Sequence, residues 1–213
     1  MLKVIVLFFL FVQILFAQTY PYFNEKNLLK IEKKYSKIAK NRVLDYQQHL
    51  KRFKTLPKSK QLNSVNFYLN QLISQYDSVS QKCEDYWKTP VEFLVSGSGD
   101  CEDYAIIKYY TLVKLGFDKR KLFLTVVVDK YSKTYHMVLS YFDKKNFPPL
   151  ILDNLSFKIL RLDKRDDLEV KKLLNEYGVY KLDKNYKLVK LKTIDITYMN
   201  FLQKIKKEKR VYR

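Results

Sequence analysis

The sequence predicts a single α+β domain in which N-terminal helices and one central helix pack on an antiparallel sheet. Apolar residues recur at helical spacing in the first half of the chain, whereas the second half carries short β-branched and alternating runs. Of the 213 residues, 47% are hydrophobic and 15% are aromatic, which suffices for a packed core. With only 4 Gly and 5 Pro, the composition favours one folded domain over a disordered or repetitive chain.

The N-terminus has the pattern of an export signal. A positively charged start precedes an apolar run over residues 4–16, and Ala17 offers a small residue for cleavage. The run is short for a membrane span, although the large Leu15 leaves an uncleaved anchor open as an alternative. We therefore expect residues 1–17 to be a signal peptide and residues 18–213 to be the mature domain, without stable membrane insertion.

Basic residues outnumber acidic residues by 41 to 22, which gives a formal net charge of +19. Such a charge can attract nucleic acid, anionic lipid or an acidic protein. Because the lysines are spread along the whole chain, we favour a general compositional bias and expect no nucleic-acid partner. A C-terminal cluster is interpreted as a solvated helix end, and it consists of Lys204, Lys206, Lys207, Lys209, Arg210 and Arg213.

Two long helices are predicted in the first part of the chain. Apolar residues recur at helical spacing over residues 24–53 and again over residues 62–83, with a break at Pro57. A short helix follows, because Thr89 can cap it and Pro90 suits its first position. The two long helices are expected to cover the core rather than to carry chemistry.

A Gly-rich turn over residues 96–99 leads into the central helix, which is predicted over residues 101–115 and ends at Gly116. The pattern then changes to that of strands. The predicted strands cover residues 122–128, 135–142, 149–152, 157–160 and 186–191. Between the last two of them, residues 163–177 are predicted to be helical.

Cys101 has the sequence context of a nucleophile. It follows the Gly-rich turn and begins a helix, where unpaired backbone N–H groups and the positive end of the helix dipole favour a thiolate. This position is expected to lower the thiol pKa and to leave room for a substrate carbonyl, while the Cys101 N–H can hold the oxyanion. Cys83 leaves a structural disulfide open as an alternative in an oxidising compartment.

A thiolate nucleophile needs a base, and the chain has 2 histidines. His49 lies in a predicted surface helix, whereas His136 lies near the start of a strand, which holds an imidazole more rigidly. Asp153 ends the next predicted strand and can orient that imidazole if the two strands are neighbours. Cys101, His136 and Asp153, on helix, strand and strand, therefore predict a catalytic triad.

The motifs around these residues resemble a known family over residues 85–160. They are Trp87-Lys88-Thr89-Pro90, Gly97-Ser98-Gly99-Asp100-Cys101-Glu102-Asp103-Tyr104-Ala105-Ile106, His136-Met137-Val138-Leu139 and Pro149-Leu150-Ile151-Leu152-Asp153-Asn154-Leu155. Their order and spacing resemble the papain-like, transglutaminase-like superfamily and, within it, the LapG-type periplasmic cysteine proteases. The resemblance implies a papain/transglutaminase-like fold, with Cys101 as nucleophile, His136 as base and acid, and Asp153 as its orienter.

The resemblance also implies a calcium site beside the nucleophile. Asp100 and Glu102 flank Cys101, and Asp103 is the next residue. These carboxylates repel one another and would raise the Cys101 pKa unless a cation neutralised them, and calcium prefers such oxygen ligands. The alternative is that the acids only favour the helix N-terminus.

Members of this family cut a large surface adhesin near its N-terminal region. They are restrained by an inner-membrane receptor, of the LapD type, that senses cyclic di-GMP. The resemblance therefore implies a calcium-dependent periplasmic endopeptidase that releases an adhesin and promotes biofilm dispersal. Two alternatives remain: transamidation or deamidation through the same acyl-enzyme, or a non-enzymatic basic envelope protein with a disulfide between Cys83 and Cys101.

Overall fold

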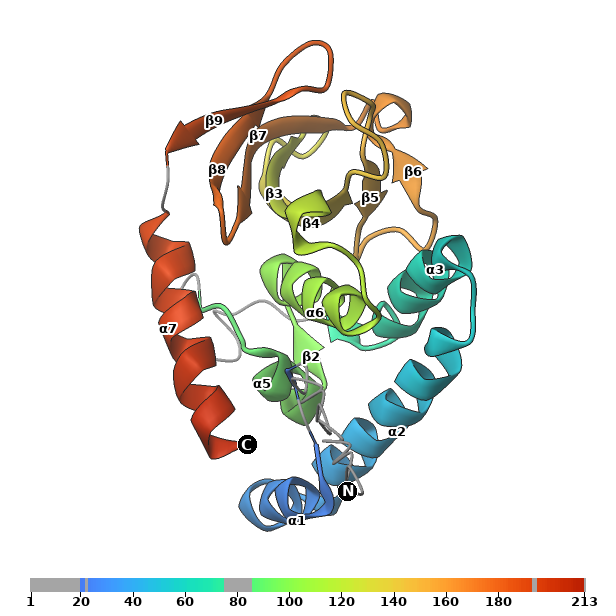
Figure 1. Ribbon diagram of the computed structural model, residues 1–213, viewed down its shortest axis with the longest axis vertical. Helices are drawn as coiled ribbons and strands as arrows, with labels where there is room; N and C mark the ends of the chain where they lie inside the picture. The colour runs from blue at the N-terminus through green and yellow to red at the C-terminus, as the bar shows by residue number, and fades with distance from the viewer. Residues whose placement is uncertain (1–19, 22, 75–85, 193–194, 213) are drawn as a thin grey trace, which may run out of the picture.

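The computed structural model describes residues 20–21, 23–74, 86–192 and 195–212. In the part of the chain so described, helices gather on one side of a seven-stranded sheet, as Figure 1 shows. The elements are α1 (Glu25–Lys34), α2 (Lys37–Lys54), α3 (Lys58–Leu69), β1 (Ile73–Ser74), α5 (Pro90–Ser96), β2 (Ser98–Gly99), α6 (Cys101–Lys114), η1 (Lys119–Lys121), β3 (Leu122–Asp129), β4 (Tyr135–Tyr141), β5 (Leu150–Leu152), β6 (Leu160–Arg161), η2 (Leu162–Lys164), β7 (Leu168–Asn175), β8 (Gly178–Leu182), β9 (Leu188–Lys192) and α7 (Ile196–Val211).

The first predicted helix, over residues 24–53, is in fact the two helices α1 and α2. Ser36 separates them, because its extended backbone interrupts the helical path. The Ser36 hydroxyl accepts a hydrogen bond from the backbone N–H of Ala39 at 3.1 Å and so caps α2. A local capping signal therefore outweighs the continuous apolar pattern.

The second predicted helix, over residues 62–83, is shorter than expected. Helix α3 begins four residues earlier, at Lys58, and ends at Leu69. The next residue, Asn70, donates hydrogen bonds from its side-chain amide to the carbonyls of Asp153 and Ser156, at 2.8 and 3.0 Å. This long-range contact accounts for the chain leaving the helix there, and the predicted residues beyond 74 lie outside the described part.

Helix α5 is capped at both ends. The Thr89 hydroxyl accepts from the backbone N–H of Glu92 at 3.1 Å, and the Glu92 carboxylate accepts from the backbone N–H of Thr89 at 2.8 Å. At the other end, Gly97 adopts the left-handed region with φ of 74°. The Arg42 guanidinium donates to the backbone carbonyls of Leu94 and Val95 in the last turn of the helix, at 3.0 and 2.6 Å. These contacts fix the turn that precedes the nucleophile.

The large sheet has the strand order β6-β5-β4-β3-β7-β8-β9, and every neighbouring pair is antiparallel. Helix α6 packs on β3 and β4. In Figure 1 it lies below the sheet, with α5 beneath it and with α3 and α7 on either side. The main core fills this interface with fully buried side chains such as Ile107 and Leu112 from α6 and Leu139 from the sheet. Helix α6 is therefore packed against the sheet on one side and against α3 and α5 on others.

Strand β7 is the largest correction to the sequence prediction, which made residues 163–177 helical. The segment instead pairs with β3 on one edge and with β8 on the other. Pairing on both edges satisfies its backbone groups, and Leu173 and Leu174 become buried, so tertiary context outweighs helix propensity. Strand β8 was not predicted, and the predicted strand over residues 157–160 is reduced to the short β6.

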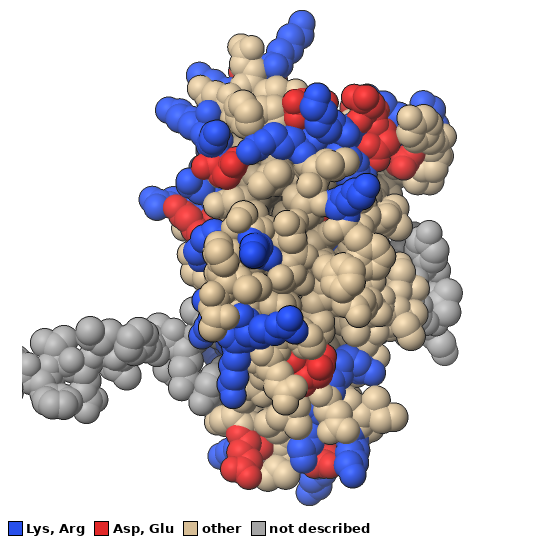
Figure 2. All heavy atoms as spheres, turned by 90° about the vertical axis from the view of Figure 1, so that its right-hand side faces the viewer, with Lys and Arg blue, Asp and Glu red and all other residues tan. Residues whose placement is uncertain are grey.

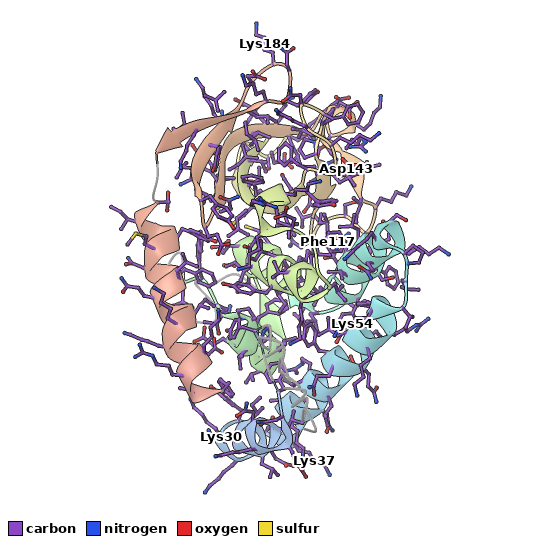
Figure 3. All side chains as sticks on the ribbon, in the orientation of Figure 1. Lys30, Lys37, Lys54, Phe117, Asp143 and Lys184 are labelled. Atoms are coloured by element: carbon purple, nitrogen blue, oxygen red, sulfur yellow. The ribbon has the colours of Figure 1, made fainter. Side chains whose placement is uncertain are left out.

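Basic side chains are distributed over the described surface. Figure 2 shows one face on which Lys and Arg side chains extend from top to bottom with Asp and Glu among them. In Figure 3, Lys30 and Lys37 lie at one end of the molecule and Lys184 lies at the other. This distribution agrees with a compositional bias. No helix in the described ranges is long and apolar enough to cross a membrane, and the predicted signal peptide over residues 1–17 lies outside them.

The predicted basic C-terminal cluster lies largely on α7, but its first member is not simply solvated. The Lys204 ammonium donates to the backbone carbonyl of Trp87 at 3.0 Å. It also lies 2.7 Å from the Glu92 carboxylate and 3.6 Å from the centre of the Tyr86 ring. Lys204 therefore joins α7 to the segment that precedes α5.

Candidate active site

The predicted base and its orienting carboxylate meet directly. His136 is the second residue of β4, and Asp153 follows the neighbouring strand β5. The Nε2 atom of His136 lies 2.8 Å from Oδ1 of Asp153. The side chains are 9% and 1% exposed. Two adjacent strands therefore hold the imidazole against a buried carboxylate.

The surroundings of Asp153 keep its carboxylate charged. Burial alone would raise the pKa of Asp153, but His136, the Leu155 backbone N–H and the Arg165 guanidinium outweigh burial and hold it below its ordinary value. An ionised carboxylate can only accept hydrogen bonds, so Nε2 of His136 carries a proton and Nδ1 is left to accept one. The imidazole is thereby prepared to act as a general base through Nδ1.

Cys101 is the first residue of α6, as the sequence predicted. The residue two positions before Cys101 must be glycine, because a Cβ atom on Gly99 would lie 2.6 Å from Oδ2 of Asp103. The Cys101 sulfur accepts a hydrogen bond from the backbone N–H of Met137, the residue after the histidine. Cys101 and His136 also line the same pocket. The packing of α6 on β4 thus places nucleophile and base in one cavity.

The thiol of Cys101 donates a hydrogen bond to the Glu102 carboxylate, with Sγ and Oε2 3.1 Å apart. Burial raises the pKa of Cys101, Glu102 raises it further, and Asp100 adds to the shift, against the Met137 N–H. This is opposite to the direction predicted from the helix N-terminus, because burial and the flanking carboxylates outweigh the helix dipole. The cysteine carries no disulfide, and Cys83 lies outside the described residues.

The site opens into a pocket of about 540 Å³ between α6, the sheet and the start of α7. Apolar side chains from β3, β4 and β7 form part of its wall, and charged side chains also line it. A concave surface that combines apolar and polar side chains is suited to binding a segment of polypeptide. The lining residues are Trp87, Cys101, Glu102, Val126, Tyr135, His136, Met137, Lys171, Lys172, Leu174, Asp195 and Thr197.

Asp103, which the sequence predicts as a calcium ligand, forms an ion pair with Lys88. Its Oδ1 atom accepts from the Lys88 backbone N–H at 2.7 Å, and its Oδ2 atom accepts from the Lys88 ammonium at 2.8 Å. The two residues are 0% and 2% exposed. This buried ion pair joins the nucleophile helix to the segment before α5, so the structure gives Asp103 a structural role.

Asp100 and Glu102 retain the chemistry of a calcium site. Both flank Cys101, and both raise its pKa as carboxylates without a cation do. Among the residues whose positions are described, no group of three or more His, Cys, Asp or Glu side chains is arranged to hold a metal ion. A calcium ion would therefore need backbone carbonyls or water beside these two carboxylates, ligands that it readily takes. Carboxylate oxygens of this kind suit calcium, and of the three predicted acids Asp100 and Glu102 are the two that are not in the ion pair with Lys88.

Arg165 is a site residue that the sequence analysis did not identify. Its Nη2 atom donates to Oδ2 of Asp153 at 2.8 Å and to Oδ2 of Asp167 at 2.6 Å. The guanidinium thereby holds the Asp153 carboxylate in place, so that its other oxygen, Oδ1, faces His136. Arg165 comes from the segment that was predicted to be helical, and no local pattern connects it with the triad.

Lys108 is a buried amine on the nucleophile helix, about two turns after Cys101. It is 0% exposed, and its ammonium has no hydrogen-bond partner among the described residues. Burial lowers the pKa of Lys108 to about 7, although the charge of Asp153 acts in the opposite direction. The helix therefore carries a destabilising charge at neutral pH.

We expect Lys108→Met to stabilise the protein by about 1–3 kcal/mol at neutral pH, because it removes a buried charge and nearly keeps the side-chain volume. Between pH 7 and the ordinary Lys pKa of 10.5, unfolded wild type binds more protons than folded wild type, so its stability rises with pH. The variant lacks this contribution, and its advantage should shrink as pH increases. Urea titrations at pH 7 and at about pH 9.5 measure the difference in free energy of unfolding between variant and wild type, with the exposed Lys60→Met as control. A variant less stable than wild type at pH 7 would contradict the expectation.

A free cysteine at a helix N-terminus, with a histidine and an aspartate on neighbouring strands, defines the site of a papain-like cysteine protease. The family comparison agrees, because the family described as "Bacterial transglutaminase-like cysteine proteinase BTLCP" matches residues 35–172. The chain therefore belongs to the bacterial transglutaminase-like cysteine proteinases. None of the curated proteins compared with the chain matches it.

Solved structures of LapG from Legionella pneumophila have the same fold. The calcium-bound form is 32% identical, with a TM-score of 0.70, and the match covers 84% of this chain and 98% of that chain. The EGTA-treated form is 32% identical, with a TM-score of 0.73, covering 86% and 98%. A further LapG structure is 36% identical, with a TM-score of 0.66, covering 75% and 88%. The predicted fold class is confirmed, and the protein is a LapG-like cysteine protease.

Proposed function

We propose that this protease is a calcium-dependent periplasmic endopeptidase that cleaves the N-terminal region of a large surface adhesin, releases the adhesin and promotes biofilm dispersal. The observation that carries the peptidase chemistry is the 2.8 Å contact between His136 and Asp153 in the pocket that Cys101 lines. The substrate class rests on the similarity to LapG-type proteases. An open pocket beside the thiol supports cleavage within a polypeptide.

The residues can perform acyl transfer in a defined order. Nδ1 of His136 accepts the proton of Cys101, and the thiolate attacks the scissile carbonyl. The backbone N–H of Cys101, at the first position of α6, stabilises the oxyanion. The imidazolium, held by Asp153, then gives its proton to the leaving amine, and water hydrolyses the thioester with His136 again as base.

Calcium is the proposed cofactor, and Asp100 and Glu102 would hold it. When bound, the ion would supply positive charge that offsets the carboxylates and lowers the cost of ionising the thiol. The hydrogen bond from Cys101 to Glu102 supports this role. Without the ion, a carboxylate oxygen of Glu102 stabilises the protonated thiol, and the ion would occupy that oxygen. A calcium-bound form of LapG from Legionella pneumophila supports it as well.

Export and regulation complete the proposal. The apolar run over residues 4–16 supports delivery to the periplasm as a signal peptide. An inner-membrane receptor of the LapD type, which senses cyclic di-GMP, would restrain the protease until the adhesin is to be released.

Incubating the mature protein with the N-terminal fragment of an adhesin from the same genome tests this function. We expect one cleavage in the presence of calcium, none after EGTA treatment, and recovery when calcium, but not magnesium, is added in excess. Prior alkylation of the thiol with iodoacetamide should abolish cleavage. Cleavage that persists after alkylation would exclude a cysteine protease mechanism, and cleavage unaffected by EGTA would exclude the calcium dependence. Mass spectrometry of the products separates hydrolysis from amine incorporation, which transamidation would give.

A further inference from the structure

A β-bulge in β7 changes which side chains face the catalytic pocket. In the pairing of β3 with β7, Val126 lies opposite Lys172 and Val127 lies opposite Val170, so Lys171 is an extra residue. In a regular strand, neighbouring side chains point to opposite faces. A bulge disturbs this alternation and redirects a side chain. Lys171 and Lys172 accordingly both line the pocket, together with Leu174.

Each of the two ammonium groups forms an ion pair with a carboxylate. Lys171 lies 2.5 Å from the Glu169 carboxylate, and these side chains are 39% and 53% exposed. Lys172 lies 3.2 Å from the Asp195 carboxylate and is itself 42% exposed. Exposed ion pairs contribute little, because water screens them and both side chains lose freedom in forming them. Lys171 can therefore exchange its contact for a carboxylate that enters the pocket, whereas Lys172 stays beside the Asp195 carboxylate, which is only 8% exposed.

The pocket lining carries charges of both signs. The carboxylates of Glu102 and Asp195 line it together with the ammonium groups of Lys171 and Lys172 on β7. Val126, Met137 and Leu174 form an apolar stretch in the same lining. A peptide with an acidic side chain near the scissile bond would meet favourable charge at the lysines, whereas a basic side chain there would be repelled.

We propose that Lys171 and Lys172 form a cationic subsite that binds an aspartate or glutamate side chain of the polypeptide substrate close to the scissile bond. This subsite rests on the proposed peptidase function, and it adds the charge preference of the substrate. Lys171 is the more specific probe, because Lys172 also contacts Asp195, the residue that caps α7 through the backbone N–H of Tyr198. A change at Lys172 would therefore disturb α7 as well as the pocket.

The test uses quenched fluorescent peptides of about twelve residues that span the mapped cleavage site of the adhesin fragment. Glu, Gln and Lys are placed in turn at each position beside the scissile bond, and kcat/KM is measured with calcium present. For wild type, we expect roughly tenfold preference for Glu over Gln at one position, mainly through KM, and a smaller preference at high salt. Lys171→Glu should reverse the order to favour Lys at that position. Lys181→Glu, on the exposed surface of β8, is the matched control and should behave like wild type.

A wild-type enzyme without preference for an acidic side chain at any position would overturn the subsite, and so would a preference that survives Lys171→Glu. A binding experiment distinguishes failure of the proposed subsite from failure of the proposed peptidase function. The Cys101→Ala protein, which cannot turn over the peptides, is titrated with the fluorescent Glu and Gln peptides. Tighter binding of the Glu peptide that is lost with Lys171→Glu supports the subsite even if no peptide is cleaved. Equal binding of both peptides overturns the subsite even if the protease is active.

Discussion

Replacing Cys101 with alanine is expected to abolish cleavage, lowering kcat/KM at least about 10⁴-fold. Without the sulfur no acyl-enzyme can form, and the pair of His136 and Asp153 has no nucleophile to activate. The fold should persist, because the residue stands at the first position of α6 and alanine loses only the hydrogen bonds that the sulfur makes with Glu102 and with the Met137 N–H. Initial rates on the adhesin fragment, together with thermal unfolding followed by circular dichroism, measure both effects.

The second cysteine provides the matched control. Cys83→Ser should retain cleavage, because in the proposed mechanism Cys101 is the nucleophile and acts as a free thiol. If Cys101→Ala still cleaves at more than about 1% of the wild-type rate, the nucleophile has been assigned wrongly. If Cys83→Ser is equally inactive while still folded, an essential disulfide becomes the better explanation.

Breaking the buried ion pair of Lys88 and Asp103 is expected to lower the free energy of unfolding by about 3–5 kcal/mol. Removing either partner leaves the other buried without its opposite charge, and it also releases the contact between α6 and the segment before α5. Asp103→Leu and Lys88→Met should each lower the urea midpoint strongly. The double variant should be less destabilised than the sum of the two, because neither charge then remains buried alone.

The exposed pair of Asp118 and Arg120 is the control for this prediction. Its side chains are 36% and 74% exposed, so Asp118→Asn should leave the urea midpoint nearly unchanged. The calcium concentration that half-activates the double variant of Lys88 and Asp103 should match that of wild type, since Asp103 is not expected to bind the ion. A large change in that concentration would restore Asp103 as a calcium ligand.

Local signals in the sequence predicted much of the site. The cap formed by Thr89 and Glu92, the first residue of α6 at Cys101 and the glycine after α6 are all encoded within a few residues, and the structure has each of them. The strands that carry His136 and Asp153 were also predicted, because β-branched and apolar runs are distinctive over short windows. The structure then places these two side chains in contact.

Other features had no local signal. The pairing of Asp103 with Lys88 joins residues 15 positions apart, and Arg165 reaches Asp153 across 12 positions from a segment that was predicted to be helical. The sequence predicted opposing effects on the Cys101 pKa, from the helix dipole and from the neighbouring carboxylates, and burial of the thiol by the packed sheet and helices decides the upward shift. In each case the partner is chosen by the packing of distant segments.

The chain alone therefore predicts its fold class and a candidate catalytic triad, because caps, glycine turns and strand periodicity act over a few residues at a time. It does not reveal the bulge that turns both Lys171 and Lys172 into the pocket, or the carboxylate that Lys88 neutralises. These depend on strand register and on burial, which exist once segments far apart in sequence are packed together.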